Sequence, residues 1–235
     1  MNEPLLNALG QPIGAPVSQT FPRPRPPRTQ MTGQFCSLVA TDPKAHASAL
    51  FEAFAKDTDG RNWTYLPYGP FEQEKDLASW MAAACAGQDP LFHTILDPLG
   101  TPIGLASFLR IDEKVGSIEV GHIHFSPLLQ RHPAATEAMF LMMRRVFDEL
   151  GYRRYEWKCD ALNAPSCKAA ERLGFQYEGT FRQATHYKGR NRDTAWFAII
   201  DTDWPAIKAA FEAWLSPENF DDTGQQKTRL QTMKS

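Results

Sequence analysis

The sequence predicts an α/β fold with a mixed, mostly antiparallel central sheet and helices on both faces. First, an alternating apolar strand after Gly116 passes through a short turn into an apolar helix that begins near Ala135. Second, another strand at 155–159 completes a strand–helix–strand unit, which should be parallel and right-handed. Third, two short apolar runs at 91–96 and 103–111 flank a turn and should form an antiparallel hairpin.

The other elements follow from local signals. A first strand is expected over 35–39, and Asp42-Pro43 supplies a cap and a proline for the first turn of the next helix. A second helix is expected over 72–86. After the strand–helix–strand unit we expect a helix from about Pro165 to Leu173-Gly174, strands at 175–181 and 194–200, and a helix at 204–214.

The chain divides into a leader, one domain and a tail. Residues 1–33 form a Pro/Arg-rich extended leader that contains FPRPRPP, and residues 34–215 form the domain. The leader could bind a proline-recognising domain or act as a basic arm, but we favour a solvated stretch draped over the domain. Residues 216–235 are polar, and we expect them to fray.

Composition excludes several classes of partner. The 235 residues carry a formal net charge of -2, so no global field draws the protein to nucleic acid or to an anionic membrane. No apolar run approaches the roughly 20 residues of a membrane span, and the N-terminus lacks a signal-peptide pattern. The four cysteines are widely spaced without a CxxC motif, which indicates reduced thiols and a cytoplasmic protein.

The turn between the strand after Gly116 and the helix near Ala135 is a candidate anion site. A strand that feeds a helix through a tight turn directs several main-chain N–H groups the same way, at the positive end of the helix dipole. Arg131 and His132 lie in this turn. The stretch therefore predicts a seat for a phosphate-bearing cofactor.

Two motifs resemble the GNAT family of acyl-CoA-dependent N-acetyltransferases, in particular the branch that contains ribosomal-protein N-terminal acetyltransferases. Residues 130–138, QRHPAATEA, are similar to the family pattern Q/R-x-x-G-x-G/A followed by T-E-A. Residues 163–166, NAPS, which lead into ERLGF at 171–175 and Glu178-Gly179, are similar to N-x-x-S, K/R-L-G-F and E-G. The resemblance covers about residues 35–200.

The sequence departs from the family pattern in three places. Arg131 and Pro133 stand where glycine is frequent, and Pro133 removes one N–H from the turn. Gly121 lies one residue further from Pro127 than usual, which a β-bulge could absorb. Ala170 stands where many members carry a tyrosine that protonates the leaving thiolate.

The resemblance implies a binding mode for acetyl-CoA as co-substrate. The strand after Gly116 and the strand at 155–159 would splay apart and admit the pantetheine arm, which pairs with the edge near Phe125. Asn163 would hydrogen-bond this arm, although a local turn is its other interpretation. The pyrophosphate would be held by the motif of Gln130, on the main-chain amides of Arg131, His132, Ala134, Ala135 and Thr136.

The resemblance also implies catalytic groups for direct attack by an amine. Glu119 is the first candidate for general base, with His122 and His124 as alternatives, and a solvated or salt-bridged strand residue is the other reading of Glu119. Because side chains alternate along a strand, Glu119 faces away from the histidines unless a bulge intervenes. Ser166 is the candidate acid for the thiolate or a helix cap, and a main-chain N–H near Ile123 or Phe125 could stabilise the oxyanion.

The acceptor pocket is expected beside an aromatic loop. Trp63, Tyr65 and Tyr68 lie close together there, and they either wall a substrate pocket, with His124, or pack onto the core. The hairpin at 186–192 would shape the same pocket. His122-x-His124 has no further ligand pattern, so we expect no metal.

We therefore expect an N-acetyltransferase that transfers acetyl from acetyl-CoA to a primary amine, either a protein N-terminus or a small molecule. The alternatives are a different acyl donor, a non-catalytic acyl-CoA-binding or regulatory protein, and an interaction protein that works through its leader. The sequence leaves the acceptor and the choice between monomer and homodimer open.

Overall fold

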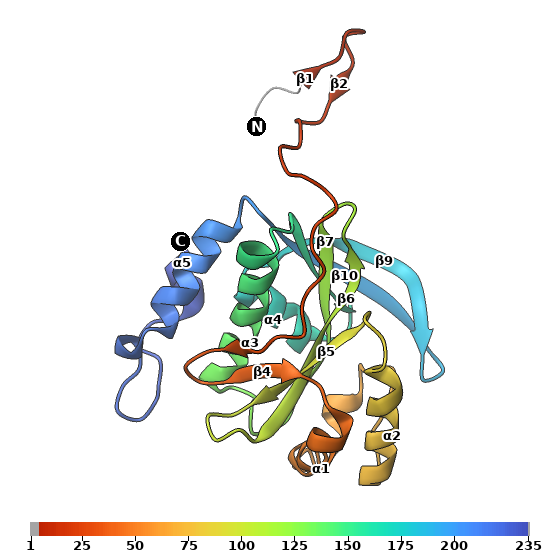
Figure 1. The fold of residues 1–235 in the computed structure, drawn as a ribbon, viewed down its shortest axis with the longest axis vertical. Coiled ribbons are helices and arrows are strands. Elements are labelled where there is room, and N and C mark those ends of the chain that lie inside the picture. Colours follow the sequence, from red (N-terminus) through yellow and green to blue (C-terminus); the bar gives the residue numbers. More distant parts are fainter. Residues whose placement is uncertain (1–4, 235) are drawn as a thin grey trace.

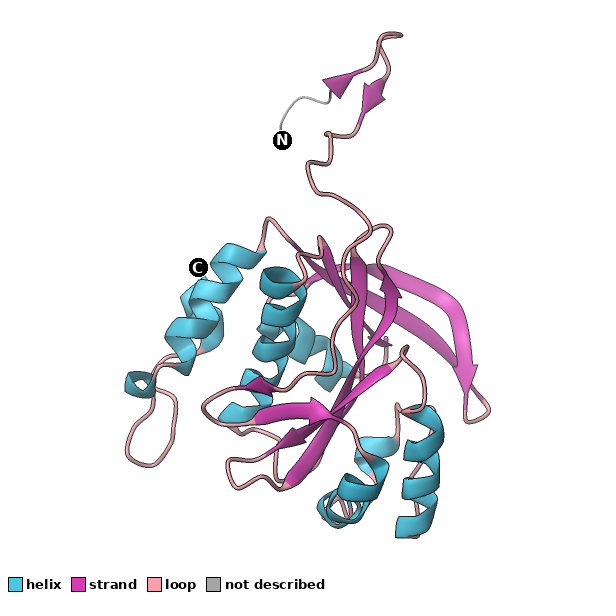
Figure 2. Ribbon diagram, viewed as in Figure 1, coloured by secondary structure: helices cyan, strands magenta, loops and turns pink. Residues whose placement is uncertain are grey.

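The computed structural model describes residues 5–234, and an eight-stranded sheet runs through its centre (Figures 1 and 2). The strand order is β3-β4-β5-β6-β7-β8-β10-β9, and only the β7–β8 pair is parallel. The strands are β3 (Met31–Thr32), β4 (Ser37–Ala40), β5 (Leu91–Leu96), β6 (Pro102–Asp112), β7 (Ser117–Phe125), β8 (Arg154–Asp160), β9 (Gln176–Tyr187) and β10 (Arg190–Ile200). The predicted α/β class with a mixed, mostly antiparallel sheet is confirmed.

Helices cover both faces of the sheet, as predicted. On one face, α1 (Pro43–Phe54) and α2 (Glu74–Ala84) build a smaller core with the 3-10 turn η1 (Arg61–Trp63). On the other face, α3 (Pro133–Arg144), α4 (Ala164–Leu173) and α5 (Trp204–Leu215) build the main core. Figure 1 shows the first pair packed below the sheet and the other three beside its opposite face.

Helix ends follow the local signals. The Asp42 carboxylate accepts the Lys44 N–H at 2.9 Å and caps α1, as predicted. Gly174 ends α4 with φ 106°, a conformation that favours glycine. The helix expected to run from about Ala135 to Leu150 is instead α3 followed by a single π-helical segment, η2 (Arg145–Glu149).

The leader is partly anchored. Its first part forms a small hairpin, β1 (Leu5–Leu6) and β2 (Pro12–Ile13), which projects from the body in Figure 1. Further along, the buried Arg145 guanidinium donates to the main-chain oxygens of Thr29 at 2.6 Å and Gln30 at 3.3 Å. Residues 31–32 then join the sheet as β3, although no strand is expected there from the sequence.

The C-terminal segment packs against the body, so the expectation that it frays is wrong for residues 217–230. It contains the 3-10 turns η3 (Pro217–Asn219) and η4 (Leu230–Lys234). Leu230 is fully buried, and the Phe220 ring lies 5.3 Å from Trp214 and 5.4 Å from Phe35. Apolar residues isolated within a polar stretch were sufficient to anchor it.

The last two strands are longer than predicted. β9 and β10 extend through the polar stretch around residues 182–192 and turn at Lys188-Gly189. Because β9 is an edge strand and is exposed along nearly all its length, its polar half shows no alternation that could reveal a strand. Within residues 5–234, no helix has the length and apolar character needed to span a bilayer.

Candidate functional site

Strands β7 and β8 part halfway along their length. Main-chain pairing runs from Ser117 opposite Arg154 to Val120 opposite Trp157, and then stops. Beyond that point β7 continues to Phe125 and β8 to Asp160 without pairing to each other. We call the space between residues 121–125 and 158–160 the β7–β8 gap; its main-chain groups are open to an added strand-like partner.

The far end of β7 presents its edge to this gap. The Ser126 N–H donates to Ile103 O on β6 at 3.2 Å. Because successive residues of a strand direct their main-chain groups to alternate sides, the groups of Phe125 face the gap. The Gln130 Nε2 donates to Phe125 O at 2.9 Å. Gln130 thus occupies an acceptor on the edge where a pantetheine arm was expected to pair.

A β-bulge in β7 decides which way its side chains face. Ser107 pairs with Gly121 and Leu105 with His124, so β7 holds one residue more than β6 between these pairs. His122 lies in the bulge with φ 50°, a left-handed conformation that is costly for a non-glycine residue. Here the bulge suggested by the sequence places Glu119 and both histidines on the α1–α2 side of the sheet.

Glu119 is a buried carboxylate held between two cations. Its residue is 3% exposed, and Oε1 accepts from Arg110 Nη1 at 2.7 Å. Its Oε2 forms an ion pair with Lys158 Nζ at 2.9 Å, without the direction of a good hydrogen bond. Burial raises the pKa of Glu119, and the two cations oppose that rise without cancelling it.

The two strand histidines are neutral. Burial lowers the pKa of His122 to about 4 and that of His124 to about 3. His122 Nδ1 lies 3.3 Å from the Tyr68 hydroxyl, at the edge of the aromatic loop. An imidazole with so low a pKa is a weak base at neutral pH, so Glu119 is the better candidate of the three.

His124 is a core residue in this structure. It is 2% exposed, and its ring stacks on Phe54 with centroids 3.9 Å apart. The Trp63 ring meets it edge-on, also at 3.9 Å. Contact between His124 and a substrate, expected from the sequence, has no support from this buried position.

The aromatic loop belongs largely to the smaller core. Trp63 is 6% exposed, and the Tyr68 ring lies 4.0 Å from that of Trp80 on α2. Tyr65 instead points outward, and its hydroxyl donates to Leu162 O at 3.1 Å. Of the two interpretations that the sequence leaves open, core packing describes Trp63 and Tyr68, while Tyr65 remains near the start of α4.

Side chains of the β9–β10 turn hold the aromatic loop. Lys188 Nζ donates to Trp63 O at 2.8 Å, and Arg190 Nη2 donates to Thr64 O at 2.7 Å. Both contacts end on main-chain carbonyls. The turn expected to shape the acceptor pocket thus lies against the loop expected to wall it.

The turn between β7 and α3 satisfies several of its own amides. The His132 N–H donates to Leu129 O at 3.3 Å, and the Ala135 N–H donates to His132 O at 3.0 Å. The Ala134 N–H donates to His132 Nδ1 at 3.2 Å, so this imidazole caps α3. Rotation of the His132 side chain would release the Ala134 N–H for an anion.

Arg131 and Pro133 fit this turn differently. Arg131 has φ 60°, the left-handed conformation for which glycine is frequent in the family motif. Pro133 is the first residue of α3, where its missing N–H costs no intrahelical bond. Thr136 follows in the first turn of α3 and is buried. The backbone therefore keeps the shape of an anion-binding turn although both glycines are replaced.

Asn163 and Ser166 lie where the gap begins. The Asn163 side chain caps α4 and accepts the Ser166 N–H at 3.2 Å. Ser166 Oγ accepts from Trp157 Nε1 at 3.0 Å, and Trp157 is the last residue of β8 paired with β7. The cap of α4 is thus Asn163, and the Ser166 hydroxyl oxygen is held by the Trp157 indole.

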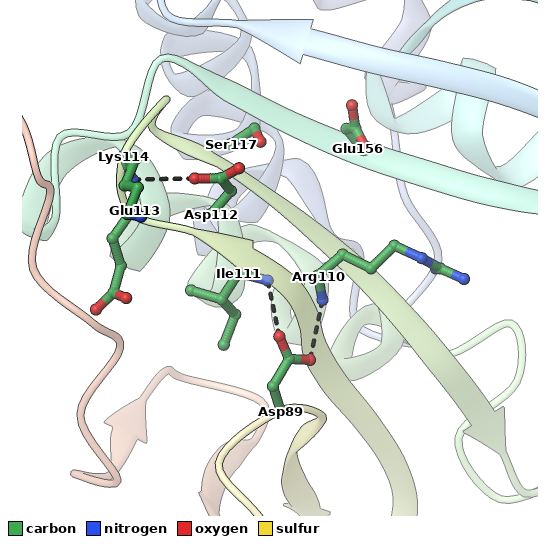
Figure 3. Close-up of a pocket in the computed structure, with 8 residues that line it drawn as sticks. All are labelled: Asp89, Arg110, Ile111, Asp112, Glu113, Lys114, Ser117 and Glu156. Atoms are coloured by element: carbon green, nitrogen blue, oxygen red, sulfur yellow. Dashed lines mark hydrogen bonds between the residues drawn. The ribbon is translucent and has the colours of Figure 1, made fainter.

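An open, shallow pocket of about 570 Å³ lies beside the paired half of β7 and β8 (Figure 3). Asp89 accepts from the Arg110 N–H at 3.0 Å and the Ile111 N–H at 2.9 Å. Figure 3 shows the Arg110 side chain extending away from Asp89, with Glu156 on β8 above it.

The sequence prediction missed Arg110, Glu156 and Lys158. Each is a charged residue with an apolar or aromatic residue on either side of it in a strand, and that signal could have identified them. Within residues 5–234, no three His, Cys, Asp or Glu side chains gather closely enough to hold a metal ion.

Comparison with known proteins identifies the fold. The family model described as "Acetyltransferase (GNAT) domain" matches residues 38–176. A GCN5-related N-acetyltransferase from Brucella melitensis has 45% sequence identity and a TM-score of 0.90, over 93% of this chain and 99% of that one. The protein called uncharacterized N-acetyltransferase p20 from Bacillus licheniformis is 28% identical over 142 residues, 59% of this chain and 78% of its own length.

Two more distant structures share the fold alone. One is the Microcin C7 self immunity acetyltransferase MccE in complex with acetyl-CoA and AMP, at 19% identity and a TM-score of 0.62 over 72% of this chain and 93% of that one. The other, from Vibrio cholerae, is named as a ribosomal-protein-serine acetyltransferase and has 18% identity and a TM-score of 0.63 over 75% of this chain and 99% of that one. With its parted strands and the matching domain model, this chain belongs to the GNAT family of acetyltransferases.

Proposed function

We propose that the protein transfers an acetyl group from acetyl-CoA to a primary amine, at a protein N-terminus or on a small molecule, by direct attack. The observation that carries this proposal is the β7–β8 gap, which begins next to a buried carboxylate on one face of the sheet and a serine hydroxyl on the other. The family relationship supports acetyl-CoA as donor.

The residues around the gap fit the donor. The unpaired edge offers the main-chain groups of Ile123 and the N–H of Phe125 to the amides of a pantetheine arm, while Gln130 occupies the Phe125 carbonyl. Near the start of α3, Arg131 carries a positive charge, and the Ala134 N–H becomes free for an anion when the His132 side chain turns away. When bound, acetyl-CoA supplies an activated thioester.

Two proton transfers are assigned to residues on opposite faces. Glu119 lies on the α1–α2 face, next to the last pair of β7 and β8 residues, and would take a proton from the amine directly or through water. Ser166 lies on the α4 face and would donate its hydroxyl proton to the thiolate while its oxygen accepts from Trp157. This arrangement lets the amine arrive from one face while the thiol leaves on the other.

The test measures free thiol release with acetyl-CoA and a panel of amines, including short peptides with free N-termini and polyamines. With the accepted amine, Glu119→Gln should lower kcat by about 10²–10³-fold, which is the usual size for loss of a general base. Ser166→Ala should lower kcat by about tenfold or more. Glu212→Gln, on the exposed side of α5, is the matched control.

Full turnover in both Glu119→Gln and Ser166→Ala would show that these roles are wrong. Binding of acetyl-CoA without turnover of any amine would favour the non-catalytic alternative. The cytoplasmic location remains a prediction.

A further inference from the structure

A lysine lies in the interior where β7 and β8 separate. Lys158 directly follows Trp157, the last β8 residue that pairs with β7. Its side chain is 8% exposed, and Nζ lies 2.9 Å from Glu119 Oε2 on β7 and 2.7 Å from Glu156 Oε2 on β8. The ammonium also lies 3.7 Å from the centre of the Trp196 ring on β10. One cation therefore touches three adjacent strands.

Burial of a lysine ammonium is costly unless opposite charges and polar groups surround it. Two carboxylates and the face of an indole ring provide that environment here. Glu156 also accepts from Arg154 Nε at 2.6 Å. The Glu156 carboxylate is thus held in place by Arg154 as well as by Lys158, and it contacts the Lys158 ammonium from within β8.

We propose that Lys158 is a positioning residue for acetyl transfer, which ties β8 to β7 where main-chain pairing ends and holds the Glu119 carboxylate ionised beside the gap. This inference rests on the proposed role of Glu119 as general base. A side-chain ion pair here takes the place of the next main-chain link without closing the gap.

Lys158 is better placed than the other charged groups around Glu119 to act on it. From β6, Arg110 also pairs with Glu119, but its side chain is 62% exposed and water screens it. From β8, the negative Glu156 opposes ionisation of Glu119, and the buried Tyr155 hydroxyl is neutral because burial raises its pKa. Removal of the Lys158 charge should therefore raise the pKa of Glu119 further.

The consequence for activity has a definite sign. A protonated Glu119 cannot accept a proton, so activity falls as pH drops through its pKa. In Lys158→Met the acidic limb of kcat/KM should move upward by at least about one pH unit, and the loss of activity should reach about tenfold on the acidic side of the wild-type limb. In Lys158→Arg, which keeps the charge, the limb should stay near its wild-type position.

A second variant should shift the limb in the opposite direction. Glu156→Gln removes a negative charge near Glu119 and leaves Lys158 paired to Glu119 alone, so the limb should move downward. A lysine that mattered only for folding would not produce shifts of opposite sign. If Lys158→Met fails to fold, Glu156→Gln and Lys158→Arg still test the proposal.

The experiment measures kcat/KM from pH 5 to 10 with acetyl-CoA and one accepted amine for wild type, Lys158→Met, Lys158→Arg, Glu156→Gln and Glu119→Gln. Because every variant meets the same amine, ionisation of the amine cancels in the comparison. Lys208→Met is the matched control, since Lys208 pairs with Asp148 at 2.7 Å outside the gap, and its profile should match wild type.

The outcomes separate the two proposals. If Glu119→Gln loses turnover while Lys158→Met and Glu156→Gln leave the acidic limb in place, Lys158 has no positioning role and the base assignment stands. If Glu119→Gln keeps both full turnover and the limb, the base assignment itself is wrong. A uniform loss at every pH in Lys158→Met, or an equal loss in Lys158→Arg, also overturns the inference.

Discussion

Replacement of Glu137 should destabilise the fold by releasing the first residues of the domain. Glu137 lies on α3 within the T-E-A motif, yet its carboxylate binds the first residues of the domain and not the β7–β8 gap. It accepts the main-chain N–H groups of Gln34 at 2.7 Å, Phe35 at 2.6 Å and Cys36 at 2.9 Å. Gly33 packs against it so closely that an added Cβ would lie 2.3 Å from Glu137 Cδ. We therefore assign Glu137 a structural role.

The magnitude follows from these contacts. A hydrogen bond to a charged group contributes about 1.5–3 kcal/mol, so three would sum to about 4.5–9 kcal/mol if they were independent. Water can reach the partly exposed Gln34 and Phe35, so the loss in Glu137→Ala should be smaller, about 3–5 kcal/mol. Glu137→Gln keeps one acceptor oxygen and should lose roughly half as much.

The assay is urea unfolding followed by tryptophan fluorescence, with Glu212→Ala as an exposed control. A double-mutant cycle sharpens it. Gly33→Ala alone should lower the free energy of unfolding by about 2 kcal/mol through overpacking. In the Glu137→Ala background, where the carboxylate is absent, the same substitution should lower it by less than about 1 kcal/mol. A loss of stability below about 1 kcal/mol in Glu137→Ala, or the same cost of Gly33→Ala in both backgrounds, would contradict the structural role of Glu137.

Two further perturbations test burial and anchoring. Burial lowers the pKa of His124 to about 3, so the neutral ring's contribution to stability is complete above about pH 6.5 and is lost as pH falls towards 3. The free energy of unfolding of His124→Phe minus that of wild type should therefore be about 2 kcal/mol larger at pH 4.5 than at pH 7.5, measured by urea unfolding. The same difference for His186→Phe, at an exposed position, should not change with pH. Arg145→Met should free the leader and speed tryptic cleavage after Arg28 by at least about tenfold relative to wild type, whereas Arg144→Met should leave the rate unchanged. A cleavage rate in Arg145→Met equal to that of wild type would contradict the anchoring by Arg145.

Element types were readable from the sequence because their signals are local. Asp42-Pro43 caps α1 and Gly174 ends α4 in the predicted manner. The strand–helix–strand unit gave the one parallel pair correctly. The family resemblance located the parting strands, because the two motifs lie at the turn into α3 and at the start of α4.

Other features depend on contacts that a single sequence does not reveal. The facing of Glu119 relative to His122 depended on a one-residue bulge, which the spacing of Gly121 suggested but could not place. Lys158 contacts Glu119 across the neighbouring strands β7 and β8, a pairing that the spacing of the two residues in the sequence does not reveal. Arg145 holds the end of the leader and Glu137 holds the first residues of the domain, and both bind main-chain atoms, which leaves no pattern in the side chains of those segments.

Amide hydrogen exchange with and without acetyl-CoA is the most direct measurement of how the donor is held. We expect acetyl-CoA to slow amide exchange in residues 121–136 and 158–166, which border the β7–β8 gap, and to leave exchange in α2 unchanged. Binding that protects other segments while the amides of Ile123 and Phe125 exchange as in the free protein would contradict this expectation.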